Sequence, residues 1–255
     1  MSERIQLTSV YLGYAFLVLF FGGFGGLAGF VPPPSPTDSA HEIQRMFLDN
    51  TTGIRAGMIV SSFAAALTLP WAAAICVQIR RIERRNPVLT YIWIAGAGCF
   101  TIEFVYPFAI YMAASFRPDE APDILRHFND LGWLALLSIV STAIVQAFAL
   151  GVAVLRDDRE TPLYPRWFAY FCFWSGTLFV PAGLIVFFKT GAFAWNGIVS
   201  WWFVVVIFGV WVIVTTQLTA RAIKVPDEHA PDDLDGLRDE VARLGREVAR
   251  LKDAR

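Results

Sequence analysis

Six long apolar runs separated by short charged clusters decide what this 255-residue chain can fold into. Charged residues make up only 17% of the chain, and most of them lie between the runs. A helix of about 20 apolar residues crosses the hydrocarbon layer of a bilayer, where each backbone polar group must be bonded within its own segment. The six runs are 10–31, 56–79, 89–115, 131–155, 167–188 and 197–220. We therefore predict an all-α integral membrane protein with a six-transmembrane-helix bundle in residues 1–221.

Lys and Arg are unevenly divided between the two sets of connections. The N-terminus, the second and fourth connections and the end of the sixth run hold ten of them: Arg4, Arg80, Arg81, Arg84, Arg85, Arg156, Arg159, Arg166, Arg221 and Lys224. The other connections hold five: Arg45, Arg55, Arg117, Arg126 and Lys189. Because cytoplasmic connections collect Lys and Arg, both termini are predicted to be cytoplasmic and the chain to lie in the cell membrane. The net charge of −1 predicts no nucleic-acid partner.

The first outer connection is expected to contain an amphipathic helix at approximately 39–49. Ser39 and Glu42 have the spacing of a capping box, and the apolar residues that follow share one helical face. His41 and Glu42 in this segment, with His127 in the next outer connection, are candidates for a metal or pH-sensing site. Solvated loop side chains are the alternative. Arg55, at the outer mouth of the second run, either binds an anion or lipid headgroup or marks the interface.

Glu103 lies near the middle of the third run, far from any other charge. A carboxyl at that depth costs at least about 2.5 kcal/mol to insert, and such residues usually face the bundle interior. Pro107 leaves the carbonyl of Glu103 without its helical donor. Counting 1.5 Å per residue places Tyr106, Thr142 and Gln146 near the same depth. We predict an intramembrane polar site made of Glu103, Tyr106, Thr142 and Gln146, which acts as a proton or cation relay or as a polar anchor for a substrate. The alternative is a neutral acid that joins helices by hydrogen bonds.

Three runs contain an interior proline: Pro70, Pro107 and Pro181. Each is expected to kink its helix because it lacks the N–H of the helical ladder. Pro70 and Pro181 lie at matching depths in the second helix of each three-helix half. This pattern is typical of inverted-repeat transporters, although prolines are also ordinary in membrane helices and the glycine-rich segment 22–29 has no counterpart in the fourth run.

The composition changes after the sixth run, where a polar linker, 222–231, precedes a segment with a regular apolar repeat. The repeat has alternating spacings of three and four and consists of Leu234, Leu237, Val241, Leu244, Val248 and Leu251. β-Branched and leucine residues alternate along this seam, which favours a parallel two-stranded coiled coil. We predict a short cytoplasmic coiled coil at 232–255 and a homo-oligomer, with a dimer favoured over a trimer or tetramer. The alternative is one helix that folds back on the cytoplasmic loops.

Three functions remain open at this point. The first is a small-molecule or ion transporter or channel with its site at Glu103. The second is an oligomeric scaffold or accessory subunit that recruits partners through the coiled coil. The third, against which the sequence leans, is a membrane enzyme acting on a lipid-soluble substrate. The chain has no phosphate-binding glycine loop, nucleophile elbow or paired-histidine motif, and we expect neither a cofactor nor a metal.

Overall fold

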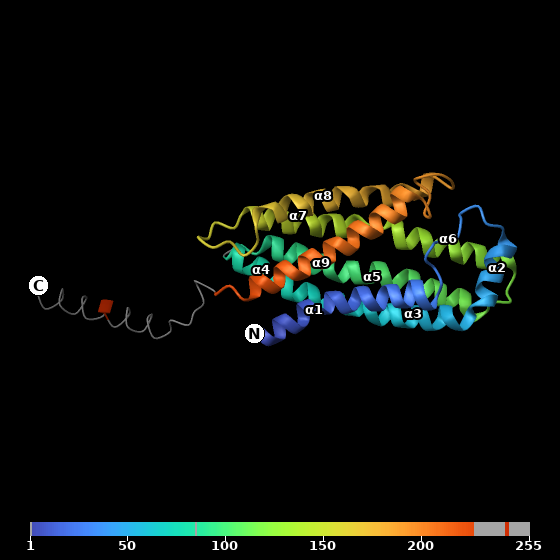
Figure 1. Cartoon of the computed structure of the whole chain (residues 1–255), viewed down its shortest axis with the longest axis horizontal. Helices are drawn as coiled ribbons and strands as arrows, with labels where there is room; N and C mark the ends of the chain where they lie inside the picture. The colour runs from blue at the N-terminus through green and yellow to red at the C-terminus, as the bar shows by residue number, and fades with distance from the viewer. Residues whose placement is uncertain (1, 85, 227–242, 245–255) are drawn as a thin grey trace, which may run out of the picture. The chain divides into compact units, whose positions relative to one another are not determined.

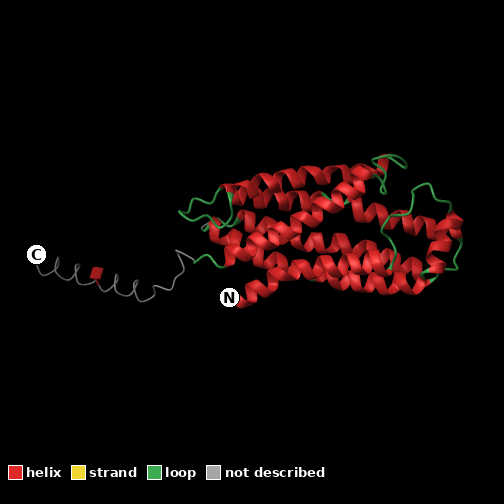
Figure 2. Cartoon of the chain, in the orientation of Figure 1, coloured by secondary structure: helices red, strands yellow, loops and turns green. Residues whose placement is uncertain are grey.

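The computed structural model describes residues 2–84, 86–226 and 243–244, and helices are the regular secondary structure of these residues (Figure 2). Six helical segments are long and apolar enough to cross a membrane. They are Glu3–Leu27, Thr51–Glu83, Val88–Phe116, Pro122–Leu155, Arg166–Phe187 and Ile198–Ile223. The all-helical fold is that of an integral membrane protein with six spans, and Figure 1 shows these segments running side by side.

The helices extend beyond the apolar runs that predict them. The second span begins at Thr51 rather than near residue 56, and the fourth begins at Pro122 rather than near residue 131. Residues 122–130, which precede the fourth apolar run, thus form the first part of the fourth span. Polar residues end an apolar run, but they do not end a helix, because water and headgroups solvate side chains outside the hydrocarbon layer.

Five of the six spans are interrupted: three change helix type within their length, and two consist of two α-helices separated by a short break. The elements are best described in chain order. They are α1 (Glu3–Phe20), the π-helical η1 (Phe21–Leu27), α2 (Ala40–Asp49), α3 (Thr51–Ala66), α4 (Thr68–Glu83), α5 (Val88–Phe116), α6 (Pro122–Ser138), α7 (Ser141–Leu155), α8 (Arg166–Phe179), the 3₁₀-helical η2 (Val180–Phe187), the π-helical η3 (Ile198–Phe203) and α9 (Val204–Ile223). Among the described residues, only α2 lies outside the spans, and only α5 forms a whole span without an interruption.

Two of the three interior prolines fall at these interruptions. Pro70 follows the break between α3 and α4 at Leu67, and Pro181 is the second residue of η2. Each proline removes a donor from the helical ladder, which explains an interruption close before it, three residues away for Pro70 and at the preceding residue for Pro181. By contrast, α5 runs through Pro107 without a change of helix type. The break between α6 and α7, at Ile139 and Val140, contains neither proline nor glycine.

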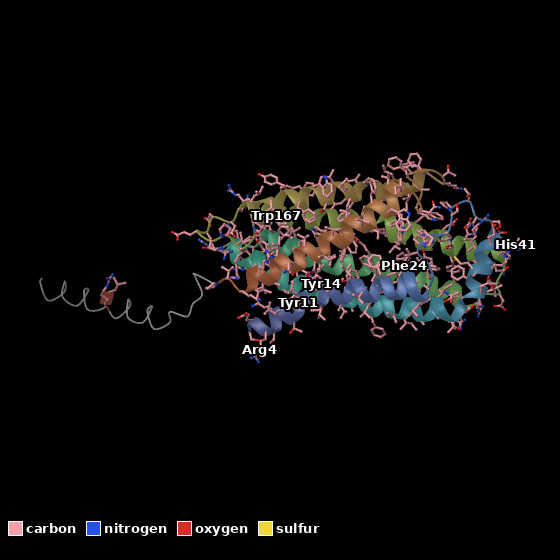
Figure 3. All side chains as sticks on the ribbon, viewed as in Figure 1. Arg4, Tyr11, Tyr14, Phe24, His41 and Trp167 are labelled. Carbon is pink, nitrogen blue, oxygen red and sulfur yellow. The ribbon has the colours of Figure 1, made fainter. Side chains whose placement is uncertain are left out.

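The connections alternate between two ends of the bundle (Figure 1). One end, here called the basic end, holds the N-terminus, the α4–α5 and α7–α8 connections and the end of α9; the other is the α2 end. Arg4 and His41 mark these opposite ends, and Phe24 lies in the bundle on the side toward the α2 end (Figure 3). Connections rich in Lys and Arg thus share one end of the bundle.

A polar network joins three spans at the basic end. Gln78 on α4 donates from Nε2 to Oε1 of Gln6 on α1, at 2.8 Å. Arg81, one turn further along α4, donates from Nη1 to the carbonyl oxygen of Ala222 on α9, at 3.0 Å. Arg81 also donates to Oε1 of Gln78, at 2.7 Å. The first, second and sixth spans are therefore tied together where they leave the apolar layer.

A buried ion pair orders the α7–α8 connection at the same end. Arg159 Nε lies 2.9 Å from Asp157 Oδ1, and the two side chains are 3% and 2% exposed. The other carboxylate oxygen accepts a hydrogen bond from the backbone N–H of Leu163, at 2.7 Å. Asp157 thus stabilises the turn by bonding to Arg159 and to the backbone of Leu163. The neighbouring Asp158 is solvated and lies 3.7 Å from Arg84 Nη2.

The capping box of α2 is present. Ser39 Oγ accepts a hydrogen bond from the backbone N–H of Glu42, and the Glu42 carboxylate accepts one from the backbone N–H of Ser39, at 2.7 Å. Ile43 and Phe47 are buried and hold α2 against the end of the bundle. The hydrogen bonds from Ser39 lower the pKa of Glu42 below its ordinary value of 4.5, because they stabilise the charged form.

The capping box predicts a pH-dependent α2. Because the pKa of Glu42 is lower in the folded state, its ionisation stabilises α2 at pH values above the ordinary pKa of 4.5. This stabilisation is lost as the pH falls through the folded-state pKa, which lies below 4.5. Amide hydrogen exchange across Ile43–Phe47, corrected for the intrinsic rate, should therefore be faster at pH 3 than at pH 6. E42Q is the control and should show the faster exchange at both pH values. Protection at pH 3 equal to that at pH 6 in the wild type would contradict this assignment.

Glycines allow the first span to pack closely on the second. A Cβ on Gly57 of α3 would lie 2.4 Å from the carbonyl oxygen of Gly23 in η1, and a Cβ on Gly23 would lie 2.6 Å from Ser61 Oγ. Any side chain at either position would push these helices apart. The glycine-rich segment therefore serves contacts within the chain, as small residues do at membrane helix interfaces.

The predicted coiled coil at 232–255 lies outside the described residues except for Arg243 and Leu244. Five seam positions also lie outside them: Leu234, Leu237, Val241, Val248 and Leu251. Leu244 is helical and half-exposed. The coiled coil and the homo-oligomer stay predictions.

Candidate functional site

A cavity of about 70 Å³ lies between five of the six spans. Apolar side chains and one carboxyl line it: Phe20, Phe21, Phe100, Glu103, Phe104, Leu136, Leu137, Ile139, Val140, Ala143, Phe179, Trp201, Val204, Val205 and Phe208. A water needs roughly 10–15 Å³ by this measure, so the cavity has room for a group of a few non-hydrogen atoms. Of the described lining residues, Glu103 alone is ionisable.

The interruptions of four spans border this cavity. Phe20 and Phe21 lie where α1 becomes η1, and Ile139 and Val140 form the break between α6 and α7. The fifth and sixth spans contribute residues at the α8–η2 and η3–α9 junctions, Phe179 and Val204. Irregular backbone at membrane depth is tolerated where protein covers it or where it borders a cavity, and π-helical segments are frequent at functional sites. The cavity thus lies where four of the helices depart from regular α-helical structure or are broken.

Ser200 satisfies part of the irregular backbone beside the cavity. Its buried hydroxyl lies 3.0 Å from the carbonyl oxygen of Pro181 in η2 and 3.1 Å from that of Phe193. Ser200 itself belongs to η3, so the hydroxyl joins the interrupted parts of the fifth and sixth spans. Hydroxyl groups of neighbouring helices are a common means of bonding carbonyls that a broken helix leaves free.

Glu103 projects from the uninterrupted α5 and accepts a hydrogen bond from the hydroxyl of Thr142, in the first turn of α7. Only 9% of Glu103 is exposed. No cationic side chain among the described residues forms an ion pair with it. An isolated carboxylate in apolar surroundings is costly. The group therefore requires either a proton or a cation from outside the described residues.

The other predicted members of the polar site do not join Glu103. Gln146 donates from Nε2 to the carbonyl oxygen of Trp93, at 3.2 Å, about three turns from Glu103 along α5. Tyr106 is half-exposed and does not line the cavity. The structure thus brings together Glu103 and Thr142, and it places Gln146 and Tyr106 elsewhere along the same helices.

Seven aromatic side chains surround the carboxyl: Phe20, Phe21, Phe100, Phe104, Phe179, Trp201 and Phe208. The six phenylalanine rings pack on one another, with centroids 5.3 Å apart for Phe20 and Phe104 and 5.8 Å apart for Phe104 and Phe208, and Trp201 packs on Phe24 and Trp133. Aromatic faces carry partial negative charge and attract cations, quaternary ammonium groups among them. An aromatic wall with a single carboxyl suits a compact group that is both apolar and positively charged.

The candidates at the α2 end have local structural partners. Arg55 donates from Nε and Nη2 to the carbonyl oxygen of Ser115, at 3.0 and 2.6 Å, and so caps the end of α5. His127 Nδ1 lies 2.6 Å from the carbonyl oxygen of Asp123, whereas His41 is exposed. Within the described residues, no group of three or more His, Cys, Asp or Glu side chains could hold a metal ion.

Three features of this region carry no clear signal in the sequence. The α6–α7 break falls at Ile139 and Val140, residue types that usually continue a membrane helix. The aromatic wall comes from four spans, so no spacing along the chain reveals it. Asp157 and Arg159 read as ordinary loop charges, although they form a buried pair. Each depends on contacts between residues that are distant in sequence or on a turn that only the fold defines.

The described lining offers one titratable group among apolar side chains. The cavity can bind a small apolar group, neutralise one positive charge and exclude water. No protein-family model, curated protein or solved structure matches this chain.

Proposed function

We propose that this protein carries small organic cations across the membrane and binds them in the aromatic cavity at Glu103. The observation that carries the proposal is the cavity itself, in which one carboxyl and seven aromatic side chains face the same space between five spans. Such a site stabilises a cation in two ways, by charge at the carboxylate and by the faces of the rings.

Proton exchange follows from the burial of Glu103. The carboxyl is 9% exposed and has no cationic partner among the described residues, so a proton neutralises it when the site is empty. A bound cation replaces that proton. Cation binding and proton release are therefore two sides of one reaction, and a proton gradient would drive the cation in the opposite direction.

The interrupted spans support movement of the walls. Helices broken near the centre of a membrane are typical of transporters, whose binding sites lie between the broken segments. Four interruptions border the cavity, while hydrogen bonds tie the first, second and sixth spans together at the basic end. We further propose that the basic end faces the cytoplasm, because Lys and Arg collect on that side of cell membranes.

Calorimetric titration of the purified full chain with tetramethylammonium chloride tests the proposal. Titrations in buffers of different ionisation enthalpy should show about one proton released for each cation bound. The affinity should rise about tenfold per pH unit over the range in which the empty site holds a proton. Binding without proton release, or no binding at any pH, would overturn the proposed exchange.

A scaffold role is the second candidate, and the hydrogen bond from Thr142 to Glu103 favours it. In that role the carboxyl stays protonated and joins α5 to α7, and the predicted coiled coil recruits partners. The scaffold role gives no reason for a cavity beside the carboxyl or for four interruptions around it. We therefore prefer the carrier.

A further inference from the structure

A second apolar hollow, of about 400 Å³, lies on the surface of the bundle between α5 and α7. It is here called the seam groove, and its lining residues are Leu89, Ile92, Ile144, Val145, Phe148, Ala149 and Val152. None of these described side chains is polar. The chain spans a membrane, so hydrocarbon rather than water faces this groove.

The seam groove and the cavity at Glu103 are lined by neighbouring residues of α7. On α7, Ala143 lines the cavity and the next residue, Ile144, lines the groove. The hydrogen bond from Thr142 to Glu103 crosses the same α5–α7 seam. At the α6–α7 break, Ile139 lines the cavity and is 41% exposed, so the cavity approaches the lipid-facing surface here. The carboxyl and the groove therefore lie along the same α5–α7 seam.

The negative charge in the cavity and the length of the seam define which molecule could occupy both. A positive group in the cavity would meet Glu103 and the aromatic wall, while a hydrocarbon chain would lie in the seam groove along α5 and α7. From Ile92 to Glu103 the helix rises about 16 Å, roughly the length of an extended chain of ten to twelve carbons. A lipid with two chains and an anionic headgroup would fit neither the narrow cavity nor its carboxyl.

We propose that the substrate is a single-chain amphiphile with a compact cationic head, which reaches Glu103 sideways from the bilayer along the seam groove. This inference rests on the proposed function, since it assigns the class of cation that the carrier takes. The head occupies the cavity and replaces the proton on Glu103. The chain lies in the seam groove, and the Thr142–Glu103 hydrogen bond must open as the head passes.

Photolabelling of the full chain in lipid nanodiscs tests the placement of both parts. The probe is decyltrimethylammonium with a diazirine at the far end of its chain. The labelled residues should fall in α5 and α7, around Leu89–Ile92 and Phe148–Val152, and tetramethylammonium should compete because it occupies the head site alone. Labelling at these residues should fall at least tenfold in E103Q.

A matched pair of variants separates the groove from the head site. V145W fills the seam groove, where Val145 is 51% exposed, and V210W places the same side chain on α9, where Val210 is 43% exposed. V145W should lower labelling at least fivefold and leave tetramethylammonium affinity within twofold of the wild type. V210W should change neither measurement.

Each other outcome has a distinct meaning. Groove labelling that changes neither with tetramethylammonium nor in E103Q would show that the groove binds ordinary lipid. This result would overturn the inference while leaving cation binding intact. Labelling spread over all lipid-facing spans would do the same. Groove residues that become labelled only when the protein is dispersed into monomers would assign the groove to a second copy of the chain. Absence of tetramethylammonium binding in the wild type would instead overturn the proposed function.

Discussion

E103Q should lose affinity for tetramethylammonium by at least about 30-fold, since removing one partner of a buried charge pair costs about 2 kcal/mol or more. Glutamine keeps the size of the side chain and can still accept the hydrogen bond from Thr142, but it has no negative charge to offer a cation. The variant should also release no protons when the cation is added. Calorimetric titration measures both effects in one experiment.

Two variants make the loss in E103Q specific to the site. E42Q removes a carboxylate of the same kind from the solvated α2 and should bind the cation as the wild type does. T142V removes the hydroxyl that bonds to Glu103 and should change affinity by tenfold at most, as one hydrogen bond contributes about 1 kcal/mol. An E103Q protein that binds tetramethylammonium with wild-type affinity would leave the carboxyl with a structural role alone.

D157A should lower the free energy of unfolding by about 3–5 kcal/mol, because it leaves the guanidinium of Arg159 buried without its carboxylate. The variant also removes the acceptor of the Leu163 backbone N–H, so the turn between α7 and α8 loses its organising group. Unfolding by sodium dodecyl sulfate in mixed micelles, followed by tryptophan fluorescence, measures the change.

The adjacent aspartate provides the control for D157A. D158A removes an exposed carboxylate whose contact with Arg84 is 3.7 Å long, and such surface pairs contribute about 0–1 kcal/mol. The double variant D157L/R159M should recover part of the lost stability, since it removes both buried charges together. Equal effects of D157A and D158A would show that burial of the pair does not determine its contribution.

The sequence predicts the membrane-spanning architecture well because the cause is local. Each span consists of enough consecutive apolar residues to satisfy its own backbone in hydrocarbon, and this property can be counted without knowing any neighbour. The same reasoning places the capping box of α2, since Ser39 and Glu42 are three residues apart. It misplaces helix ends such as Thr51 and Pro122, because the polar residues there leave the apolar layer without leaving the helix.

The site could be anticipated only in part. Burial of an acid far from other charges identifies Glu103, and equal depth identifies Thr142, which bonds to it. Depth alone does not identify a partner, however, because rotation about the helix axis decides which side chains meet. Gln146 bonds to the backbone at Trp93 for that reason, and Tyr106 turns toward the lipid. Neither rotation nor the aromatic wall can be read from spacing along one chain.

The uninterrupted α5 has a consequence for how such a carrier could work. Glu103 belongs to the one described span that has no interruption, whereas the other walls of the cavity belong to interrupted spans. A carboxyl on an uninterrupted helix would stay at constant depth while the surrounding segments rearrange. Changes in the distances from labels on α5 to labels on α6, η2 and η3 would thus report how these segments move relative to the helix that holds the bound cation.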